Sequence, residues 1–464
     1  MKNEVFVIYF LSAAKRDDQN DQEGPMYRDI LKELNDWKQS RRRKPLLITG
    51  VRQCGKTYTI KEFGRTSFEN MVYINFESDE HFAEIFDYNF DTGRIIKEIE
   101  AVLREKITPG KTLLVFDEIQ ECPRAITSLK YFCEEMRDLH LVCAGSLLGV
   151  ALKAENVSFP VGKVNRLRMF PMNFREFVTA CGGSNFIDAL SNWPVSRPVP
   201  DLYRIPMESF LKDYYLVGGM PEAVNEWISS HDLKEVEAVQ EEILDDYADD
   251  FSKHAPKTEV EKIRWIWDSV PKQLAKDNNK FMFSHVKEGK RAADLEAALT
   301  WLSDAGLVTK LEMVENMELP LSACADATFF KVYLSDIGLL RRKTGLPESF
   351  YDGAPELFSR FKGALTENFV LNEFLSLGIS PYYWRSGNTA EVDFIYEEDG
   401  RVIPAEVKSA DNVQAKSIRI FCRKYHPEKG FKLSLKNIAE NPCENTRMIN
   451  LPLYMIWGKD GLSI

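Results

Sequence analysis

The sequence predicts an α/β protein built from three successive regions, and three observations lead to that prediction. Short apolar, strand-like segments alternate with helix-like segments in the first third of the chain, which is typical of a parallel sheet covered by helices. The middle of the chain shows mainly helical periodicity. Near the end, Asp399-Gly400 separates two alternating runs and indicates a two-residue β-hairpin in a smaller α/β region.

Composition and charge limit the class of protein. The chain has 464 residues, 44% of them hydrophobic and 28% charged, with a net charge of −11. These values are typical of a packed protein of several domains, and no apolar run approaches the ~18–20 residues of a membrane span. The eight cysteines are scattered without a C-x-x-C pair, so we expect reduced thiols in a cytoplasmic protein. The negative charge argues against a generally basic nucleic-acid coat, while local basic clusters keep nucleic-acid binding open.

The first segment is expected to stand apart from the rest. Residues 1–25 hold a short apolar stretch followed by a polar linker, and they lack the features of a signal peptide. Helical periodicity begins at Met26. We therefore predict that residues 1–25 are a non-core N-terminal extension, with an amphipathic anchor as the alternative.

A glycine-rich loop follows the first predicted strand. Residues 50–57 read GVRQCGKT, and a helical start comes directly after them; strand, loop and helix are the setting of a Walker A motif, or P-loop. Gly50 and Gly55 let the backbone curl so that its N–H groups converge on phosphate oxygens. Lys56 is expected to reach the β/γ-phosphates, and Thr57 to offer its hydroxyl to Mg²⁺. The sequence therefore predicts a site for ATP and Mg²⁺.

A pair of carboxylates ends another apolar run, residues 112–116. We expect Asp117 in the Mg²⁺ shell and Glu118 beside the attacking water, which it would polarise. A further strand, residues 139–144, leads to Ser146. Ser146 is a candidate sensor of the γ-phosphate, and simple turn chemistry is the alternative.

Several segments resemble one family. LLITGVRQCGKT, LLVFDEIQECPRAITSLKYF, LVCAGSLLG and YYLVGGMPEAV are similar to the bacterial and archaeal AAA-type ATPases of the AAA_14/DUF4143 family. Together with the residue patterns, the resemblance implies four regions after the extension: a P-loop ATPase core at 26–195, a helical lid at 196–260, a winged-helix-like region at 261–345 and a DUF4143 C-terminal region at 346–464. Many relatives have Gly-Arg where this chain has Gly162-Lys163. Arg166 would have to act as the arginine finger towards the nucleotide, or no finger acts.

The middle regions are expected to couple the ATPase core to the C-terminal region rather than to carry catalytic residues. Residues 241–254 are strongly acidic, and we expect a solvated helix face. Two helix-like segments and then strand-like residues follow, in the order of a winged helix. Its main local cations are Lys287, Lys290 and Arg291, and both DNA binding and protein contacts stay open.

The C-terminal hairpin carries the second candidate site. With Asp399-Gly400 as its turn, Asp393 falls opposite Glu406, and Lys408 lies one step along the same face. Directly opposed carboxylates repel, and a divalent cation between them would replace that repulsion by coordination. Lys408 is then placed to orient or activate a water. Pro404 is a candidate site of a bulge.

This arrangement resembles the PD-(D/E)xK nuclease-like signature. Asp393 and Glu406-Val407-Lys408 match its strand residues, and Glu367, in GALTENFV, resembles its helical acid. The resemblance implies a restriction-endonuclease-like fold in which Glu367, Asp393 and Glu406 hold a metal ion. The alternative is a solvated, charged hairpin face.

Together these predictions describe a cytoplasmic AAA-type ATPase. Its cofactors are ATP and Mg²⁺, and its nucleotide cycle is expected to control a C-terminal DNA-binding or metal-dependent nuclease-like domain. DNA and a protein are the expected partners, an oligomer is compatible with the sequence, and no membrane partner is expected. The alternative function is an ATP-dependent switch or scaffold that binds a protein or nucleic acid and cuts nothing.

Overall fold

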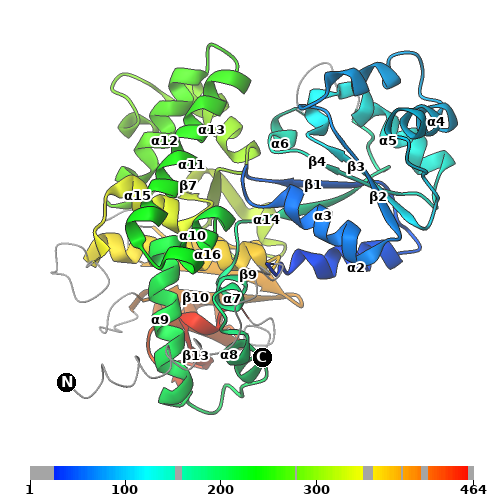
Figure 1. The fold of residues 1–464 in the computed structure, drawn as a ribbon. Helices are drawn as coiled ribbons and strands as arrows, with labels where there is room; N and C mark the ends of the chain where they lie inside the picture. Colours follow the sequence, from blue (N-terminus) through cyan, green and yellow to red (C-terminus); the bar gives the residue numbers. More distant parts are fainter. Residues whose placement is uncertain are drawn as a thin grey trace.

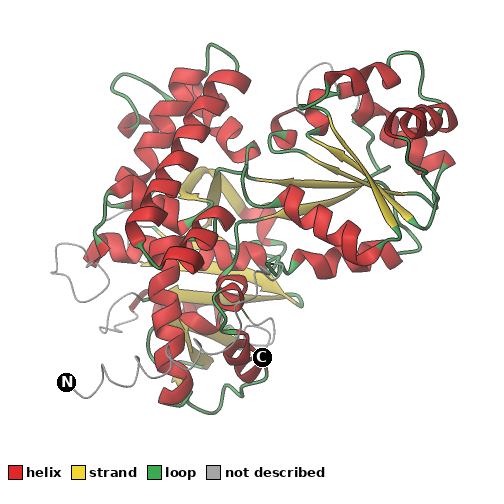
Figure 2. Ribbon diagram, in the orientation of Figure 1, coloured by secondary structure: helices red, strands yellow, loops and turns green. Residues whose placement is uncertain are grey.

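The chain forms an α/β domain at its front, beside a second body in which helices pack on a mixed sheet (Figures 1 and 2). The computed structural model describes residues 26–151, 159–276, 280–348, 359–387, 390–408 and 416–457. The extension predicted at residues 1–25 lies outside them. In the part of the chain that is described, no helix is long and apolar enough to cross a membrane. All eight cysteines are free thiols, as predicted.

The front sheet has five parallel strands in the order β2-β3-β4-β1-β5. These strands are β1 (Leu46–Gly50), β2 (Asn70–Asn75), β3 (Thr112–Asp117), β4 (His140–Ala144) and β5 (Asn165–Met169). The helices around them are α2 (Ile30–Gln39), α3 (Lys56–Ser67), α4 (Thr92–Leu103), α5 (Pro123–Glu135) and α6 (Leu148–Ala151). This arrangement confirms the predicted parallel-sheet core.

Both faces of the front sheet are covered, because successive apolar residues along each strand point to opposite sides. Leu46 packs in the core formed with α2 and α3, whereas Leu47 packs in the core formed with α4 and α5. Because β3, β4 and β1 are neighbouring parallel strands, their carboxyl ends lie at the same edge of the sheet. The two layers of helices lie on opposite sides of this sheet (Figure 1).

The second body begins with helices. They are α7 (Phe174–Ala180), α8 (Ser184–Ser191), α9 (Asp201–Val217), α10 (Pro221–Ser230), α11 (Leu233–His254), α12 (Val260–Leu274), α13 (Ala292–Asp304), α14 (Leu321–Cys324) and α15 (Ile337–Thr344). Short 3₁₀ helices are η1 (Glu80–Phe86) and η2 (Ile119–Glu121) in the front domain, and η3 (Phe283–His285) and η6 (Leu453–Met455) here. α12 and α13 are followed by the antiparallel pair β6 (Val308–Val314) and β7 (Ala325–Leu334), in the order that the sequence predicts.

This strand pair does not stand alone as a wing. β6 also pairs in parallel with β8, so that one eight-stranded sheet runs β12-β13-β11-β10-β9-β8-β6-β7. Its C-terminal strands are β8 (Tyr382–Ser386), β9 (Ala390–Glu398), β10 (Arg401–Val407), β11 (Lys429–Ser434), β12 (Ala439–Cys443) and β13 (Thr446–Pro452). The middle and C-terminal regions thus share a sheet, and a separate winged helix is not what the strands build.

The predicted hairpin register is confirmed for β9 and β10. Arg401 pairs with Glu398, and the pairing continues without a shift to Ala405 opposite Phe394. Pro404 therefore introduces no bulge. The irregularity lies on the other side of β9, where its register with β8 shifts between Tyr382 and Trp384.

Helices pack on both faces of this hairpin, and Glu406 is only 4% exposed, so the charged face is solvated only in part, at Glu391 and Glu397. Phe374 of α16 (Ser359–Ser376) packs edge-on against Phe394. On the opposite face, Ile395 is fully buried in a cluster with Phe421 of α17 (Lys416–Tyr425). The charged residues of the hairpin must consequently find partners inside the protein.

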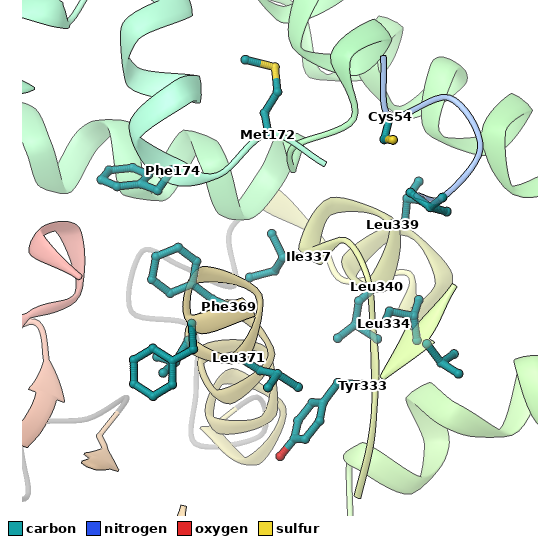
Figure 3. Close-up of a cluster of buried hydrophobic side chains, with 14 of the residues drawn as sticks. Cys54, Met172, Phe174, Tyr333, Leu334, Ile337, Leu339, Leu340, Phe369 and Leu371 are labelled. Atoms are coloured by element: carbon teal, nitrogen blue, oxygen red, sulfur yellow. The ribbon is translucent and has the colours of Figure 1, made fainter. Parts of the chain in front are cut away.

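One apolar core connects the front domain with the second body (Figure 3). Its members include Cys54 of the glycine loop, Met172 and Phe174 on the way into α7, Ile337, Leu339 and Leu340 of α15, and Phe369 and Leu371 of α16. The glycine loop, α15 and α16 thus share one close-packed core.

Candidate functional site

The loop after β1 has the shape that a phosphate requires. Gly50 approaches β5 so closely that a Cβ atom would lie 2.3 Å from the carbonyl oxygen of Met169, and Gly55 has φ +92°. Only glycine meets both demands without strain. Lys56 begins α3, and its Nζ donates to the carbonyl oxygens of Gly50 (3.0 Å) and Val51 (2.8 Å). The predicted loop residues thus lie together.

Thr57 and Asp117 meet at the edge of the sheet, as predicted. The Thr57 hydroxyl donates to Asp117 Oδ2 at 2.7 Å, and the Tyr73 hydroxyl donates to the same oxygen at 2.6 Å. Burial and this carboxylate raise the pKa of Tyr73, so the phenol stays a donor. A hydroxyl beside a carboxylate is the donor set that holds Mg²⁺ next to a phosphate. The loop and this pair therefore fit a Mg²⁺–nucleotide.

Glu118 is positioned by the loops after β3 and β4. It has a left-handed backbone with φ 48°, which turns its side chain towards Ser146. Ser146 Oγ donates to Glu118 Oε1 (3.2 Å), and Gln120 Nε2 donates to Glu118 Oε2 (2.6 Å). The two predicted residues, Glu118 and Ser146, are thus joined to each other. Gln120 was missed because nothing in its sequence context marks it.

Arg166 is the predicted nucleotide ligand that the structure does not bring to the loop. It pairs with Leu47 in the middle of β5, away from the carboxyl edge of the sheet, and its guanidinium lies 4.4 Å from the ring centroid of Phe159. Within this chain Arg166 therefore contacts an aromatic ring, since its register on β5 points it away from the phosphate cradle.

A buried arginine braces the loop, and sequence reasoning missed it. Arg28 is 4% exposed. It donates to the carbonyl oxygens of Cys54 (2.7 Å) and Phe170 (2.6 Å) and to Glu176 Oε2 of α7 (3.1 Å). Fully desolvated charges of opposite sign need this kind of complete hydrogen bonding. Arg28 thereby fixes the loop to the start of α7.

The acidic helix α11 contacts the loop from the other side. Asp250 accepts from Arg52 at 2.5 Å, and Asp246 accepts from Gln53 at 2.7 Å. Tyr247 donates to the Arg52 carbonyl at 3.0 Å. The predicted solvated face holds for most of the helix, but Asp250 is 8% exposed. α11 therefore packs against the glycine loop, and its role as a lid over the nucleotide stays a prediction.

In the C-terminal region, three of the predicted residues lie around the end of β10. Asp393 Oδ2 accepts from the backbone N–H of Val407 at 2.8 Å, and Lys408 donates to Glu406 Oε1 at 2.6 Å. Burial, and then the charges of Glu406 and Glu367, hold the pKa of Asp393 well above its usual range. Burial also raises the pKa of Glu406 against the opposing effect of Lys408. The carboxylates thus gather as the hairpin register predicts.

Glu367 has partners that the sequence did not predict. It accepts from the Tyr333 hydroxyl at 2.7 Å and from Lys331 Nζ at 3.4 Å, and Lys331 also donates to Glu391 Oε1 at 2.8 Å. Lys331 lies on β7 and is 1% exposed. A lysine inside the apolar run FFKVYL was the available signal, because a buried ammonium needs carboxylate partners.

The predicted three-carboxylate metal site is therefore not preformed. Among the described residues, no group of three or more His, Cys, Asp or Glu side chains is arranged so that it holds a metal ion. The physical reason is visible in the contacts: Lys331 and Tyr333 bind Glu367, and Lys408 binds one oxygen of Glu406. The other oxygen, Glu406 Oε2, is buried and accepts no hydrogen bond within the described structure.

Comparisons with known domains define the class. Residues 42–178 match the model of an AAA domain, so the front of this chain is an AAA-type ATPase domain, and the protein is an ATPase. More particularly, residues 208–349 and 362–454 match two domains of unknown function, DUF8612 and DUF4143. The AAA and DUF4143 matches bear out the corresponding parts of the resemblance seen in the sequence. A search of curated proteins found no match.

Solved structures show distant likenesses. A Walker-type ATPase of Pyrococcus abyssi has 15% identity and a TM-score of 0.44, over 70% of this chain and 99% of that one. The ORC2 protein of Aeropyrum pernix, solved with ADPNP and ADP, has 12% identity and a TM-score of 0.38, over 71% and 96%. ORC1 of the same organism, solved with DNA, has 14% identity and a TM-score of 0.30, over 70% and 95%. These scores are too low to carry an argument about this chain.

Proposed function

We propose that the ATPase cycle of the front domain controls a metal-dependent, nuclease-like site in the C-terminal region. One observation carries this proposal: a continuous set of buried contacts leads from the glycine loop to α16, the helix that bears Glu367. Two sites that share such a packed connection can be biased by one conformational change.

The connection has three steps. Arg28 joins the Cys54 carbonyl of the loop to Glu176 of α7. At the start of the same helix, the backbone N–H of Phe174 donates to Glu373 Oε1 of α16 at 2.9 Å. Glu373 is 1% exposed, and burial raises its pKa to about 8. A neutral carboxyl therefore docks α16 on the start of α7, which Arg28 joins to the glycine loop, at physiological pH.

The carboxylate cluster fits a divalent cation. Glu406 Oε2 is a buried oxygen that accepts no hydrogen bond in the described structure. Asp393 lies close enough to Glu406 for the charge of Glu406 to raise the pKa of Asp393. Asp393 and Glu406 would hold the cation, which supplies Lewis-acid activation of a phosphodiester and of water. Burial lowers the pKa of Lys408, but Glu406 and Asp393 outweigh it and raise the pKa. Lys408 consequently acts as a donor that orients a phosphate or water, not as a base.

A nucleic acid is the partner favoured by cations that lie against partly exposed aromatic rings in the middle region. Lys280 lies 3.5 Å from the ring centroid of Phe329, and Lys287 lies 5.0 Å from that of Trp265. Cations interleaved with aromatic rings suit a phosphate backbone with stacked bases. These residues belong to α12, β7 and the segments beside them, the region for which the sequence left both DNA binding and protein contacts open.

The test is cleavage of a supercoiled plasmid and of single-stranded oligonucleotides by the full chain. Mg²⁺ or Mn²⁺ is added, with and without ATP, and Lys408→Ala is compared with Lys416→Ala, an exposed lysine of α17 in the same region. We expect ATP-dependent cleavage that Lys408→Ala abolishes and Lys416→Ala retains. Cleavage that survives Lys408→Ala would come from elsewhere and would remove the proposed site.

A second candidate is a nucleotide-dependent switch that cuts nothing. It is favoured by the pairing of the cluster with two lysines, Lys331 and Lys408, which lets the carboxylates stay buried without a metal. It predicts association that depends on the bound nucleotide. For a Glu118→Gln variant, which should bind ATP and hydrolyse it slowly, identical elution on size exclusion with ATP and ADP would count against this candidate.

A further inference from the structure

Lys331 is the most deeply buried cation beside the carboxylate cluster, and the proposed nuclease-like function has so far given it no role. Its side chain is 2% exposed, and it lies 2.8 Å from Glu391 Oε1 and 3.4 Å from Glu367 Oε2. It comes from β7, which precedes the C-terminal region in the chain. The cluster is thus completed by a strand of the middle region, through the sheet that the two regions share.

The contacts divide the cluster into two parts. In the first part, Lys331 holds Glu367 and Glu391, and Tyr333 donates to Glu367 as well. In the second part, Glu406 keeps one oxygen without a hydrogen-bond donor in the described structure, and Asp393 lies next to it. An oxygen that is buried without a donor favours an added cation, whereas oxygens that already bind an ammonium do not.

We infer that Lys331 is a positioning residue that takes the place of a second metal ion. It keeps Glu367 and Glu391 outside the metal shell, so that the cluster binds one divalent cation, between Asp393 and Glu406. This inference deepens the proposed function and rests on it, because it presumes that the cluster binds a metal. It also assigns Glu367 a role different from the ligand role that its resemblance to a helical nuclease acid implies.

The chemistry of the site follows from this division. Lys331 is a fixed cation that offsets one of the two negative charges of Glu367 and Glu391, whether or not a metal ion is bound. A substrate phosphate then meets one exchangeable cation and the Lys408 ammonium. Removing the Lys331 charge leaves Glu367 and Glu391 without that counter-ion, and two such carboxylates are a ligand pair for a second divalent ion.

The test counts Mn²⁺ ions bound to the full chain without nucleotide, by electron paramagnetic resonance of free Mn²⁺. Glu406→Gln identifies the ion held between Asp393 and Glu406, and Glu391→Gln identifies an ion held between Glu367 and Glu391. We expect one cluster ion in the unmodified protein and two in Lys331→Met, whose unbranched side chain matches the lysine stem as far as Cε and carries no charge. Two cluster ions in the unmodified protein, or still one in Lys331→Met, would overturn the inference.

Glu367→Gln provides a second measurement that does not depend on the folding of Lys331→Met. If Glu367 lies outside the ligand shell of the metal, the Kd of Glu367→Gln for Mn²⁺ differs from that of the unmodified protein by less than about threefold. The reason is that Glu367 then acts on the ion only through the electrostatic effect of its charge at a distance. Loss of a ligand or its direct support weakens binding about 10–100-fold, and we expect that loss for Glu406→Gln. A similar loss for Glu367→Gln would overturn the inference. If Glu406→Gln removes no ion from any variant, the metal site itself fails, and with it the proposed nuclease function.

Discussion

The nucleotide loop draws most of its polar groups from residues 50–57, whereas the carboxylate cluster draws its side chains from β7, α16, β9 and β10. In the loop, backbone groups and one lysine satisfy one another. In the cluster, charged side chains from distant parts of the chain neutralise one another. A site built from neighbouring residues depends on local conformation, and a site built from distant residues depends on how the regions are held together.

The largest expected effect concerns the link between the two sites. Arg28→Ala leaves the Glu176 carboxylate without its counter-ion, in a place where both side chains are only 4% exposed. Removing one partner of such a buried pair costs about 3–5 kcal/mol. We expect this loss in the free energy of unfolding, measured by urea denaturation. The control is Lys111→Ala, which removes an exposed ion pair with Glu69 and should cost less than about 1 kcal/mol; equal losses would show that Arg28 braces nothing.

The next effect should be confined to the nucleotide site. Lys56→Ala removes the ammonium at the start of α3, and we expect kcat/KM for ATP to fall about 100–1,000-fold, or about 3–4 kcal/mol. Lys97→Ala, an exposed change on α4, should leave hydrolysis unchanged. Mn²⁺ binding at the cluster should be the same in both variants. A parallel loss of Mn²⁺ binding would mean that the two sites are not separable.

An intermediate effect comes from the junction of α7 and α16. The pKa of Glu373 is raised from 4.5 to about 8 by burial, so the folded state keeps a proton that the unfolded chain loses above pH 4.5. This contribution to stability is complete below pH 4.5 and is lost as the pH rises through 8, by up to about 1.4 kcal/mol per pH unit. Glu373→Gln should flatten that slope between pH 5 and 8 and make the protein more stable at pH 8.5. An unchanged slope in thermal unfolding would place the titrating group elsewhere.

The smallest effect concerns the contact between α11 and the glycine loop. Asp250 binds Arg52 of the loop at 2.5 Å, and its negative charge opposes a nearby phosphate. Asp250→Asn weakens this pairing and removes the charge, so we expect the ATP Kd to fall about threefold, or roughly 0.6 kcal/mol. Its matched control is Asp249→Asn, the exposed neighbour on α11. Weaker ATP binding in Asp250→Asn would mean that the pair holds the loop in its binding shape.

The sequence predicts the nucleotide site better than the cluster. The residues of the nucleotide site follow one another in short motifs, whereas those of the cluster are far apart in the chain. The GVRQCGKT loop and Asp117 follow from local patterns, and the hairpin register follows from a two-residue turn. Arg28 and Lys331 escape such reasoning, because each contacts residues more than 30 positions away. The expected wing is not confirmed for the same reason: its two strands are present, but the pairing of β6 with β8 is a tertiary contact that no local period reveals.

Pairing of β6 with β8 has a consequence for how the protein is made. During synthesis β7 emerges about 50 residues before β8, and translation proceeds at roughly 5–20 residues per second. For several seconds the β6 edge is therefore a finished strand without its neighbour, which is the kind of edge that recruits foreign strands. A ribosome-bound intermediate that ends between β7 and β8 is consequently the species in which we expect this chain to need a chaperone most. For the same reason, expressing the C-terminal region from residue 346 onward would leave β8 without its partner and lower the yield of folded protein.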